Sequence, residues 1–206
     1  KKIKSVNSKI NSNIINVKGY ESITNEKVLD KWLKILNEQS IIAVDTETSS
    51  LNPLEADLVG ISFSYAPNKA CYIPLAHKNI KGLKKEAVLK KIKPILEDPS
   101  IKKVGQNIKF DFLILNQNNI EITPLEDTML ISYTLDAGTN RHNLDTLSEI
   151  HLNHKTISYK ELVGTGKNKL NFSDIALDKA TEYAAEDADV TLRLYNYLKE
   201  RLDKEK

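Results

Sequence analysis

Two acidic side chains come directly after a short apolar segment that has the composition of a buried strand. The segment is residues 41–44 (Ile-Ile-Ala-Val), and it leads into Asp45 and Glu47. Side chains two residues apart in a strand point the same way, so the two carboxylates are expected to lie together. They repel each other and lose hydration there, and a shared hard cation such as Mg²⁺ or Mn²⁺ would offset both costs. The alternative is an acid pair that only caps the following turn.

A third carboxylate, Asp111, lies between two aromatic residues, Phe110 and Phe112. This setting predicts that Asp111 is at or near the buried face of a helix. Asn107 precedes it by four residues and would share that helix face. The alternative has Asn107 as the helix N-cap and Asp111 in solvent.

A fourth carboxylate follows a tyrosine by one helical turn. Tyr183 and Asp187 form an i, i+4 pair, and the alanines between them leave room for another group to approach closely. Glu186 and Asp189 are nearby acids, and only the phase with Tyr183 favours Asp187 over them. The alternative is an ordinary acidic helix with a packed tyrosine.

The hydrophobic pattern predicts the elements that must position these residues. Period-two and β-branched segments predict strands at 13–17, 41–46, 58–65, 70–74 and 101–104. Helical periodicity predicts helices at 26–37, 84–96, 107–116, 127–135, 143–151 and 177–201, the last broken near its start. Residues 153–172 are expected to form a surface loop. Strands first, then alternation, then helices indicate an α/β fold with a mixed central sheet flanked by helices.

Length and composition limit the class of protein. A chain of 206 residues is expected to form one domain, here residues 13–206, after a linker or disordered start at residues 1–12. Cys71 is the only cysteine, which excludes an internal disulfide and a cysteine-based metal cluster. No apolar segment approaches the ~20 residues of a membrane helix. The chain does not begin with Met, so we expect it to be part of something larger.

Charge is unevenly distributed along the chain. The net charge is +2, but residues 78–109 carry ten Lys against three acids, while residues 110–206 carry eleven basic and seventeen acidic residues. The basic stretch could attract a polyanion. It could equally be the solvated face of a helix.

The order of the acidic segments carries more information than any one of them. A strand Asp-x-Glu, a helical Asn-x₃-Asp and a later Tyr-x₃-Asp could bring four carboxylates from three elements around two divalent ions ~3.5–4 Å apart. This order resembles the three motifs of the DEDD superfamily of 3′–5′ exonucleases, in the subclass with tyrosine in the third motif. Within it, the chain is most similar to the proofreading domains of bacterial DNA polymerase I, which are family A polymerases. The similarity covers roughly residues 13–206 and rests on segments 44–51, 104–111 and 183–191, with shorter matches at 72–77, 127–130, 141–142 and 154–157.

The resemblance implies a ribonuclease-H-like fold and a specific chemistry. It assigns Asp45, Glu47, Asp111 and Asp187 as ligands of two divalent ions, Mg²⁺ or Mn²⁺, with Zn²⁺ as an alternative at one site. It assigns Tyr183 to orient the attacking water. The implied reaction is hydrolysis of the 3′-terminal phosphodiester, which releases 5′-nucleoside monophosphates. Because all four acids are present, the resemblance also implies an active enzyme.

The resemblance further implies a set of substrate contacts. Leu51 corresponds to a wedge against the terminal bases, Arg141 to a contact with backbone phosphate, and Tyr159 to an aromatic that stacks on a base. For Leu51 and Tyr159 the alternative is plain packing. The complete implied set of substrate-binding residues is Thr46, Leu51, Gln106, Asn107, Arg141 and Tyr159.

The partners implied are single-stranded DNA 3′ ends and a polymerase domain of the same parent chain. We also expect no membrane association, a monomer, and a cytoplasmic, nucleoid-associated location. Two alternatives stay open. One is the same chemistry on RNA, as in ribonuclease D relatives, and the other is a non-catalytic domain that binds strands or only supports a polymerase.

Overall fold

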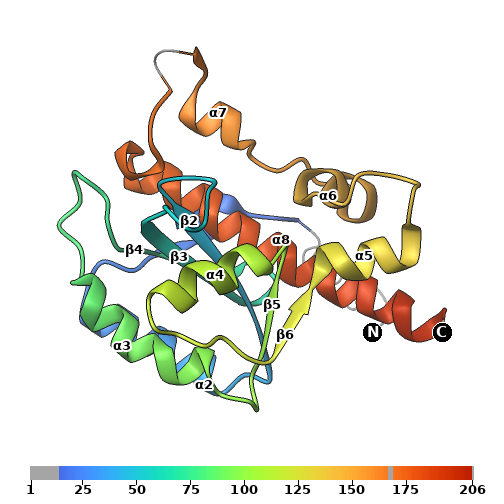
Figure 1. The fold of residues 1–206 in the computed structure, drawn as a ribbon, viewed down its shortest axis with the longest axis horizontal. Helices are drawn as coiled ribbons and strands as arrows, with labels where there is room; N and C mark the ends of the chain where they lie inside the picture. Colours follow the sequence, from blue (N-terminus) through green and yellow to red (C-terminus); the bar gives the residue numbers. More distant parts are fainter. Residues whose placement is uncertain (1–13, 167–168, 206) are drawn as a thin grey trace, which may run out of the picture.

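The computed structural model describes residues 14–166 and 169–205, which form one mixed sheet with helices on both faces (Figure 1). The sheet has six strands in the order β1-β4-β3-β2-β5-β6. Their bounds are β1 Glu21–Ser22, β2 Ile41–Thr48, β3 Leu58–Ala66, β4 Lys69–Pro74, β5 Lys102–Gly105 and β6 Leu125–Asp127. Strands β2, β3 and β4 pair antiparallel, and β1, β5 and β6 add parallel pairs. The predicted mixed sheet is confirmed.

The helices divide between the two faces of the sheet. Helix α8 runs across β2, β3, β4 and β5 on one face, and α5 and α6 pack against it. Helices α2 and α3 bury their apolar side chains on the other face. The helix bounds are α2 Glu26–Asn37, α3 Lys85–Leu96, α4 Lys109–Gln117, α5 Thr128–Asp136, α6 Leu144–Leu152, α7 Tyr159–Val163 and α8 Leu177–Lys204, with short 3₁₀ turns η1 Val17–Gly19 and η3 Phe172–Asp174.

Alternation along β2 decides which side chains meet α8. Ile42 and Val44 are fully buried in the core that α2 and α3 share with the sheet. Ala43, Asp45 and Glu47 therefore point to the opposite face. On that face α8 approaches closely, because Ala184 and Ala188 present almost no side chain and are fully buried.

Several elements differ from the sequence-based expectation. The strand predicted at 13–17 is wrong for its described part: Val17–Gly19 is a 3₁₀ turn, and pairing with β4 begins only at Glu21. The β-branched Ile14 suggested a strand, yet its side chain is 63% exposed while Ile23 is fully buried. The predicted break near the start of α8 is also wrong, since the helix is continuous from Leu177.

Strand β6 and helix α7 were also not predicted. Strand β6 has only three residues and extends the sheet beside β5. Helix α7 lies inside the stretch expected to be loop, and Ser158 begins it with a capping box to Glu161. The linker predicted for residues 1–12 lies outside the described residues, and the domain limits 13–206 stay a prediction. Within the described part of the chain, no helix is both long enough and apolar enough to cross a membrane.

Asp189, a fully buried residue of α8, ties three separate segments together. It accepts a hydrogen bond from the Tyr20 hydroxyl at 2.8 Å and from the backbone N–H of Asn68 at 3.1 and 3.2 Å. Arg193, one turn further along α8, donates to both carboxylate oxygens at 3.1 and 3.2 Å. The N-terminal segment and the β3–β4 turn are thus fixed to the helix that crosses the sheet.

We expect Asp189→Ala to lower the free energy of unfolding by about 3 kcal/mol, because it leaves several buried donors without this carboxylate. Urea denaturation followed by Trp32 fluorescence measures the change. Asp203→Ala, on the exposed end of α8 where Asp203 lies 3.7 Å from Lys199, is the control and should change it by less than about 0.5 kcal/mol. Equal effects of the two variants would contradict the tying role of Asp189.

Candidate active site

Three of the four predicted carboxylates meet where the end of β2 faces α8. Oxygens of Asp45, Glu47 and Asp187 all lie within 4.8 Å of one another. Asp45 and Glu47 come from the same face of β2, as the two-residue spacing predicts, and Asp187 comes from α8. Glu47 is 7% exposed, whereas Asp45 and Asp187 are half-buried, so the cluster can be reached from solvent.

One carboxylate oxygen of this cluster lacks a hydrogen-bond donor within the described part of the chain. Glu47 Oε1 is buried and has no hydrogen-bond partner among the residues that the structure describes. A buried carboxylate oxygen without a partner is costly. Carboxylate oxygens are the donors that hard divalent cations prefer. The residues present therefore fit a divalent cation held by Asp45, Glu47 and Asp187.

Asp111, the fourth predicted ligand, lies next to this group rather than within it. Its Oδ1 oxygen accepts hydrogen bonds from the backbone N–H and the hydroxyl of Thr46, at 2.8 and 2.6 Å. Thr46 lies between the two acids of β2, so these bonds hold the start of α4 against the strand that carries Asp45 and Glu47. The Thr46 side chain, predicted to contact substrate, is used here to orient Asp111.

The pKa values of the carboxylates at the site are raised, because the side chains are buried or half-buried and carry like charges close together. Burial raises the pKa of Asp45 first, and the charges of Asp111, Glu47 and Asp187 raise it further. Burial, and then the charges of Asp187 and Asp111, also raise the pKa of Glu47. Burial raises the pKa of Asp111 to about 7, although the Thr46 hydrogen bonds oppose the shift. The four carboxylates together disfavour their own ionisation and favour a compensating cation.

Tyr183 stands one turn before Asp187 and is hydrogen-bonded to it. Burial, and then the charge of Asp187, raises the pKa of the Tyr183 hydroxyl, so it stays protonated. The centroid of its ring lies 6.0 Å from those of both Phe172 and Tyr159. The hydroxyl is thereby directed at the carboxylates while the ring is held from behind.

The acids beside Asp187 on α8 point elsewhere. Glu186 accepts hydrogen bonds from the segment after α6, at His154 Nε2 and the backbone N–H of Ile157. Asp189 faces Tyr20, as described above. Helical phase thus separates three acids that are almost adjacent in sequence, and only Asp187 reaches the β2 pair.

The loop before α4 departs from the prediction. Asn107 has a left-handed backbone with φ of 57°, and α4 begins only at Lys109, so the predicted shared face of Asn107 and Asp111 is wrong. Nor is Asn107 the N-cap, which is Ile108. The carboxylate of Asp127 accepts from the backbone N–H groups of both Asn107 and Ile108, at 3.0 and 3.1 Å. Asp127 also caps α5, and sequence analysis placed it only at the start of that helix.

The side chain of Gln106 is hydrogen-bonded within the protein and is not an open contact surface. Its side-chain oxygen accepts from the Thr128 hydroxyl at 2.5 Å, and its nitrogen donates to the carbonyl of His142 at 2.6 Å. These bonds join the end of β5 to the start of α5 and to the loop before α6. Both polar atoms of Gln106 therefore already have partners within the protein.

The other three predicted substrate contacts are exposed. Leu51 follows the end of β2 and its side chain is 88% exposed, so it is not packed. Arg141 is exposed in the connection between α5 and α6. Tyr159 is the first residue of α7 and is half-exposed, and its ring centroid lies 6.0 Å from that of Tyr183.

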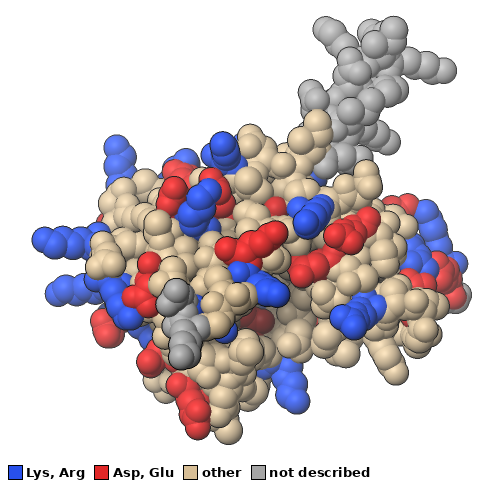
Figure 2. All heavy atoms as spheres, turned by 90° about the horizontal axis from the view of Figure 1, so that it is seen from above, with Lys and Arg blue, Asp and Glu red and all other residues tan. Residues whose placement is uncertain are grey.

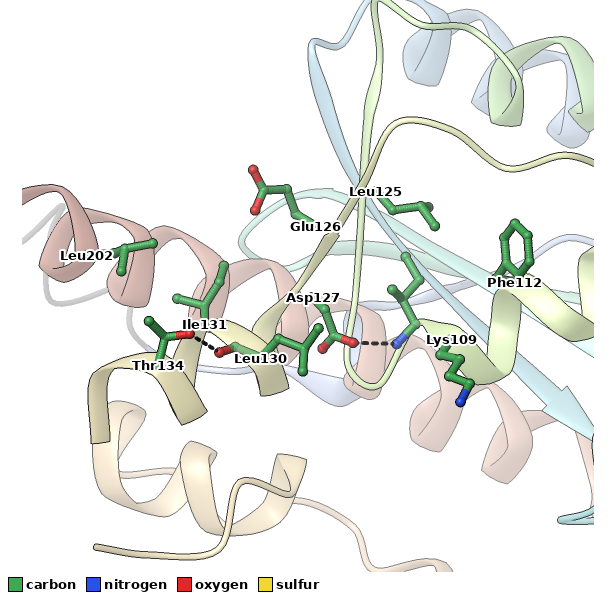
Figure 3. Close-up of a pocket in the computed structure, with 10 residues that line it drawn as sticks. Lys109, Phe112, Leu125, Glu126, Asp127, Leu130, Ile131, Thr134 and Leu202 are labelled. Carbon is green, nitrogen blue, oxygen red and sulfur yellow. Dashed lines mark hydrogen bonds between the residues drawn. The ribbon is translucent and has the colours of Figure 1, made fainter. Parts of the chain in front are cut away.

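A cavity of about 570 Å³ lies apart from this cluster, between α4, β6, α5 and the end of α8 (Figure 3). Its lining is mostly apolar, from side chains such as Phe112, Leu125 and Leu130. Figure 3 shows the Asp127 carboxylate turned toward the backbone nitrogen of Ile108. None of Asp45, Glu47, Asp111 and Asp187 lines this cavity.

Surface charge is mixed on the face of the molecule drawn in Figure 2. Acidic and basic side chains are interspersed on this face and form no single positive field. Within the basic stretch predicted from sequence, Lys91 on α3 pairs with Asp30 on α2 at 2.7 Å. The positive charge of α3 is thus partly balanced, on the side of the sheet away from α8.

Comparison with known proteins identifies relatives over most of the chain. Residues 20–203 match a family model described as 3′–5′ exonuclease. DNA polymerase I of Rhizobium leguminosarum is 43% identical over 203 residues, covering 89% of this chain and 20% of that protein. DNA polymerase I of Pseudomonas aeruginosa is 42% identical over 190 residues, covering 89% of this chain and 21% of that protein. The chain therefore spans about a fifth of the length of these curated relatives.

Solved structures show the same fold at lower identity. Brucella melitensis NrnC superposes with a TM-score of 0.67 at 24% identity, covering 90% of this chain and 82% of that one. Escherichia coli RNase D, described as an exoribonuclease involved in structured RNA processing, gives 0.66 at 21% identity, covering 90% and 45%. These likenesses confirm the predicted ribonuclease-H-like fold.

Without a divalent cation, we expect stability to fall as pH rises. The four carboxylates have raised pKa values in the folded state, so the folded state binds protons more tightly than the unfolded state. Proton binding therefore stabilises the fold fully below about pH 4, the pKa of an unfolded carboxyl group. This stabilisation is lost as pH rises through about 7, the pKa of Asp111. Urea unfolding in EDTA between pH 5 and 8, followed by Trp32 fluorescence, measures the slope. Asp45→Asn should flatten the slope and unfold at higher urea than the unsubstituted chain at pH 8.

Addition of Mn²⁺ at pH 8 is the second arm of this experiment. It should restore the stability of the unsubstituted chain and have much less effect on Asp45→Asn, because the variant lacks one ligand. Identical pH slopes for the two proteins in EDTA would contradict the proposed charge repulsion. Burial lowers the pKa of His77 and of His151, and this contribution is common to both proteins and cancels in the difference.

Proposed function

The chain belongs to the 3′–5′ exonuclease family found in DNA polymerase I, and from this premise we propose that it is the proofreading domain of a longer DNA polymerase. The proposed reaction is hydrolysis of the 3′-terminal phosphodiester of single-stranded DNA, which releases 5′-nucleoside monophosphates and shortens the strand by one. One observation carries it. Oxygens of Asp45, Glu47 and Asp187 converge within 4.8 Å and include a buried oxygen for which the described residues provide no donor.

The family is metal-dependent, and the proposed cofactors are two divalent ions, Mg²⁺ or Mn²⁺, with Zn²⁺ as an alternative at one site. Asp45, Glu47 and Asp187 would hold them, with Asp111 as the fourth ligand. Bound divalent ions supply Lewis acidity that activates water and balances the charge on the reacting phosphate. The protein's part is to keep the four carboxylates fixed, and the Thr46 hydrogen bonds to Asp111 serve that end.

Tyr183 has a separate role in the proposal. Its hydroxyl is hydrogen-bonded to Asp187 and remains protonated, so it can orient a water molecule without removing the proton from it. The ring contacts with Phe172 and Tyr159 restrict the direction of that hydroxyl. Orientation of the nucleophile lowers the barrier without any covalent intermediate on the protein.

The substrate contacts divide into two groups by what their side chains do. The exposed Leu51, Arg141 and Tyr159 are available to a DNA strand, as a wedge, a phosphate contact and a stacking ring. Thr46 and Gln106 are engaged internally and would act by positioning their neighbours. Asn107 is exposed on the left-handed turn before α4, where its side chain can reach the terminal nucleotide.

The proposed partner is the polymerase domain of the same longer chain, since the curated relatives are about five times as long as this domain. We propose a monomeric domain and a cytoplasmic, nucleoid-associated location. The RNase D likeness in fold keeps single-stranded RNA as the second substrate to test. A non-catalytic domain is opposed by the presence of all four acids.

The activity test uses a single-stranded DNA oligonucleotide labelled at its 5′ end, with Mg²⁺ or Mn²⁺ against EDTA. We expect a metal-dependent ladder that shortens from the 3′ end and is absent for Asp187→Ala. Asp178→Ala, an exposed aspartate on the first turn of the same helix, is the matched control and should leave the ladder unchanged. A matched RNA strand should be degraded more slowly. No ladder from folded protein would favour the non-catalytic domain.

Tyr183→Phe should separate orientation of water from metal binding. We expect kcat to fall by about 10²-fold, the loss that results when a reacting group is misplaced by about 1 Å. KM and the affinity for Mn²⁺ should stay close to those of the unsubstituted chain, because the ring and the carboxylates remain. A rise in KM with kcat unchanged would instead assign Tyr183 to substrate binding.

A further inference from the structure

Glu186 lies next to Asp187 in sequence but is turned away from the carboxylate cluster. It is 1% exposed and both of its oxygens are engaged. Oε1 lies 2.8 Å from His154 Nε2, and Oε2 accepts the backbone N–H of Ile157 at 2.6 Å. Both oxygens of Glu186 are therefore directed at the segment after α6, and the carboxylate is not part of the cluster formed by Asp45, Glu47 and Asp187.

The segment that Glu186 holds leads directly to the aromatic residue beside the active site. His154 and Ile157 lie in the connection between α6 and α7, and Tyr159 is the first residue of α7. Figure 1 shows α7 at the edge of the domain, where it contacts α8. At its far end Val163 is buried in a cluster with Phe172. The near end, where Tyr159 lies, is held by the contact of its ring with that of Tyr183, at 6.0 Å between centroids, and by the connection that precedes it.

The connection also forms hydrogen bonds with side chains of α6. Thr156 donates from its hydroxyl to Asp145 of α6 at 2.7 Å, and the Ser148 hydroxyl donates to the carbonyl of His154 at 2.8 Å. These bonds attach the connection to α6. The Glu186 carboxylate differs from them because it fixes the connection to α8, the helix that carries Asp187 and Tyr183.

We propose that Glu186 is a positioning residue that presents the Tyr159 ring to the 3′-terminal base. By fixing residues 154–157 to α8, it sets the distance between Tyr159 and the carboxylates, and it acts through Tyr159 rather than on the reacting atoms. This inference rests on the proposed function, since it assigns Tyr159 to the substrate. It adds a role for the acid beside Asp187 that does not involve metal binding.

Steady-state kinetics on the labelled oligonucleotide test the proposal. Glu186→Ala should raise KM by about ten-fold, the effect of losing one base–aromatic stacking contact, with kcat little changed. Glu186→Gln should be close to the unsubstituted chain, because its amide can still accept from Ile157 and donate to His154. Glu200→Ala, an exposed glutamate near the end of α8, is the matched control and should leave KM unchanged.

A double-substitution cycle distinguishes positioning from general destabilisation. In the Tyr159→Leu background, Glu186→Ala should cause no further rise in KM, because the ring that it positions is already gone. An equal rise in both backgrounds, or no rise in either, would overturn the proposal. A fall in kcat without a change in KM would overturn it as well.

Hydrogen exchange gives a readout that does not need activity. Glu186→Ala should increase amide exchange in residues 154–163 and leave the rest of α8 protected. Unchanged exchange there would overturn the proposed role of Glu186 even if the domain is an active exonuclease. Faster exchange together with no 3′–5′ cleavage by the unsubstituted chain would instead overturn the proposed function and the assignment of Tyr159 to a substrate.

Discussion

The repulsion among carboxylates at the end of β2 is the constraint on which the rest of the structure depends. Asp45, Glu47 and Asp187 approach within 4.8 Å, on a strand and a helix whose backbone hydrogen bonds fix them in place. Alanines on α8 allow the helix to lie against the sheet. Gly60 pairs with Glu47 in the sheet, and a Cβ atom there would lie 1.9 Å from the Tyr72 hydroxyl oxygen, so this packing admits no larger residue. The fold thus maintains charge crowding that a bound cation would relieve.

Helix α8 links the carboxylate cluster to other segments of the domain through its side chains. Glu186, Asp187 and Asp189 lie within four residues, and helical geometry directs them to three different places. Asp189 fixes the N-terminal segment and the β3–β4 turn, Asp187 completes the carboxylate cluster, and Glu186 fixes the connection to α7. A single continuous helix therefore sets the relative positions of the strand ligands and of the segments around them.

Local periodicity explains what could be predicted from the sequence. The two-residue spacing of Asp45 and Glu47, and the phase of Tyr183 with Asp187, depend only on regular backbone geometry. Asn107 was placed wrongly because its left-handed backbone depends on Asp127, twenty residues later, which no local pattern reveals. Helix α7 was missed although Ser158 and Glu161 carry a capping-box signal, because five residues are too few to show a helical period.

The site combines parts of different stiffness, and the difference follows from what each part has to do. The carboxylates lie on β2, α4 and α8, where backbone hydrogen bonds and burial fix them. Leu51, Arg141 and Tyr159 lie on loops and on the first residue of a short helix, where the chain can adapt. A nuclease that removes one nucleotide at a time meets a new terminal base in each cycle but always the same phosphodiester. Rigid ligands for the constant phosphate and adaptable contacts for the variable base are therefore compatible in one site, provided that a hydrogen-bonded connection keeps the two in register. The bonds of Glu186 to the connection before Tyr159 meet that requirement.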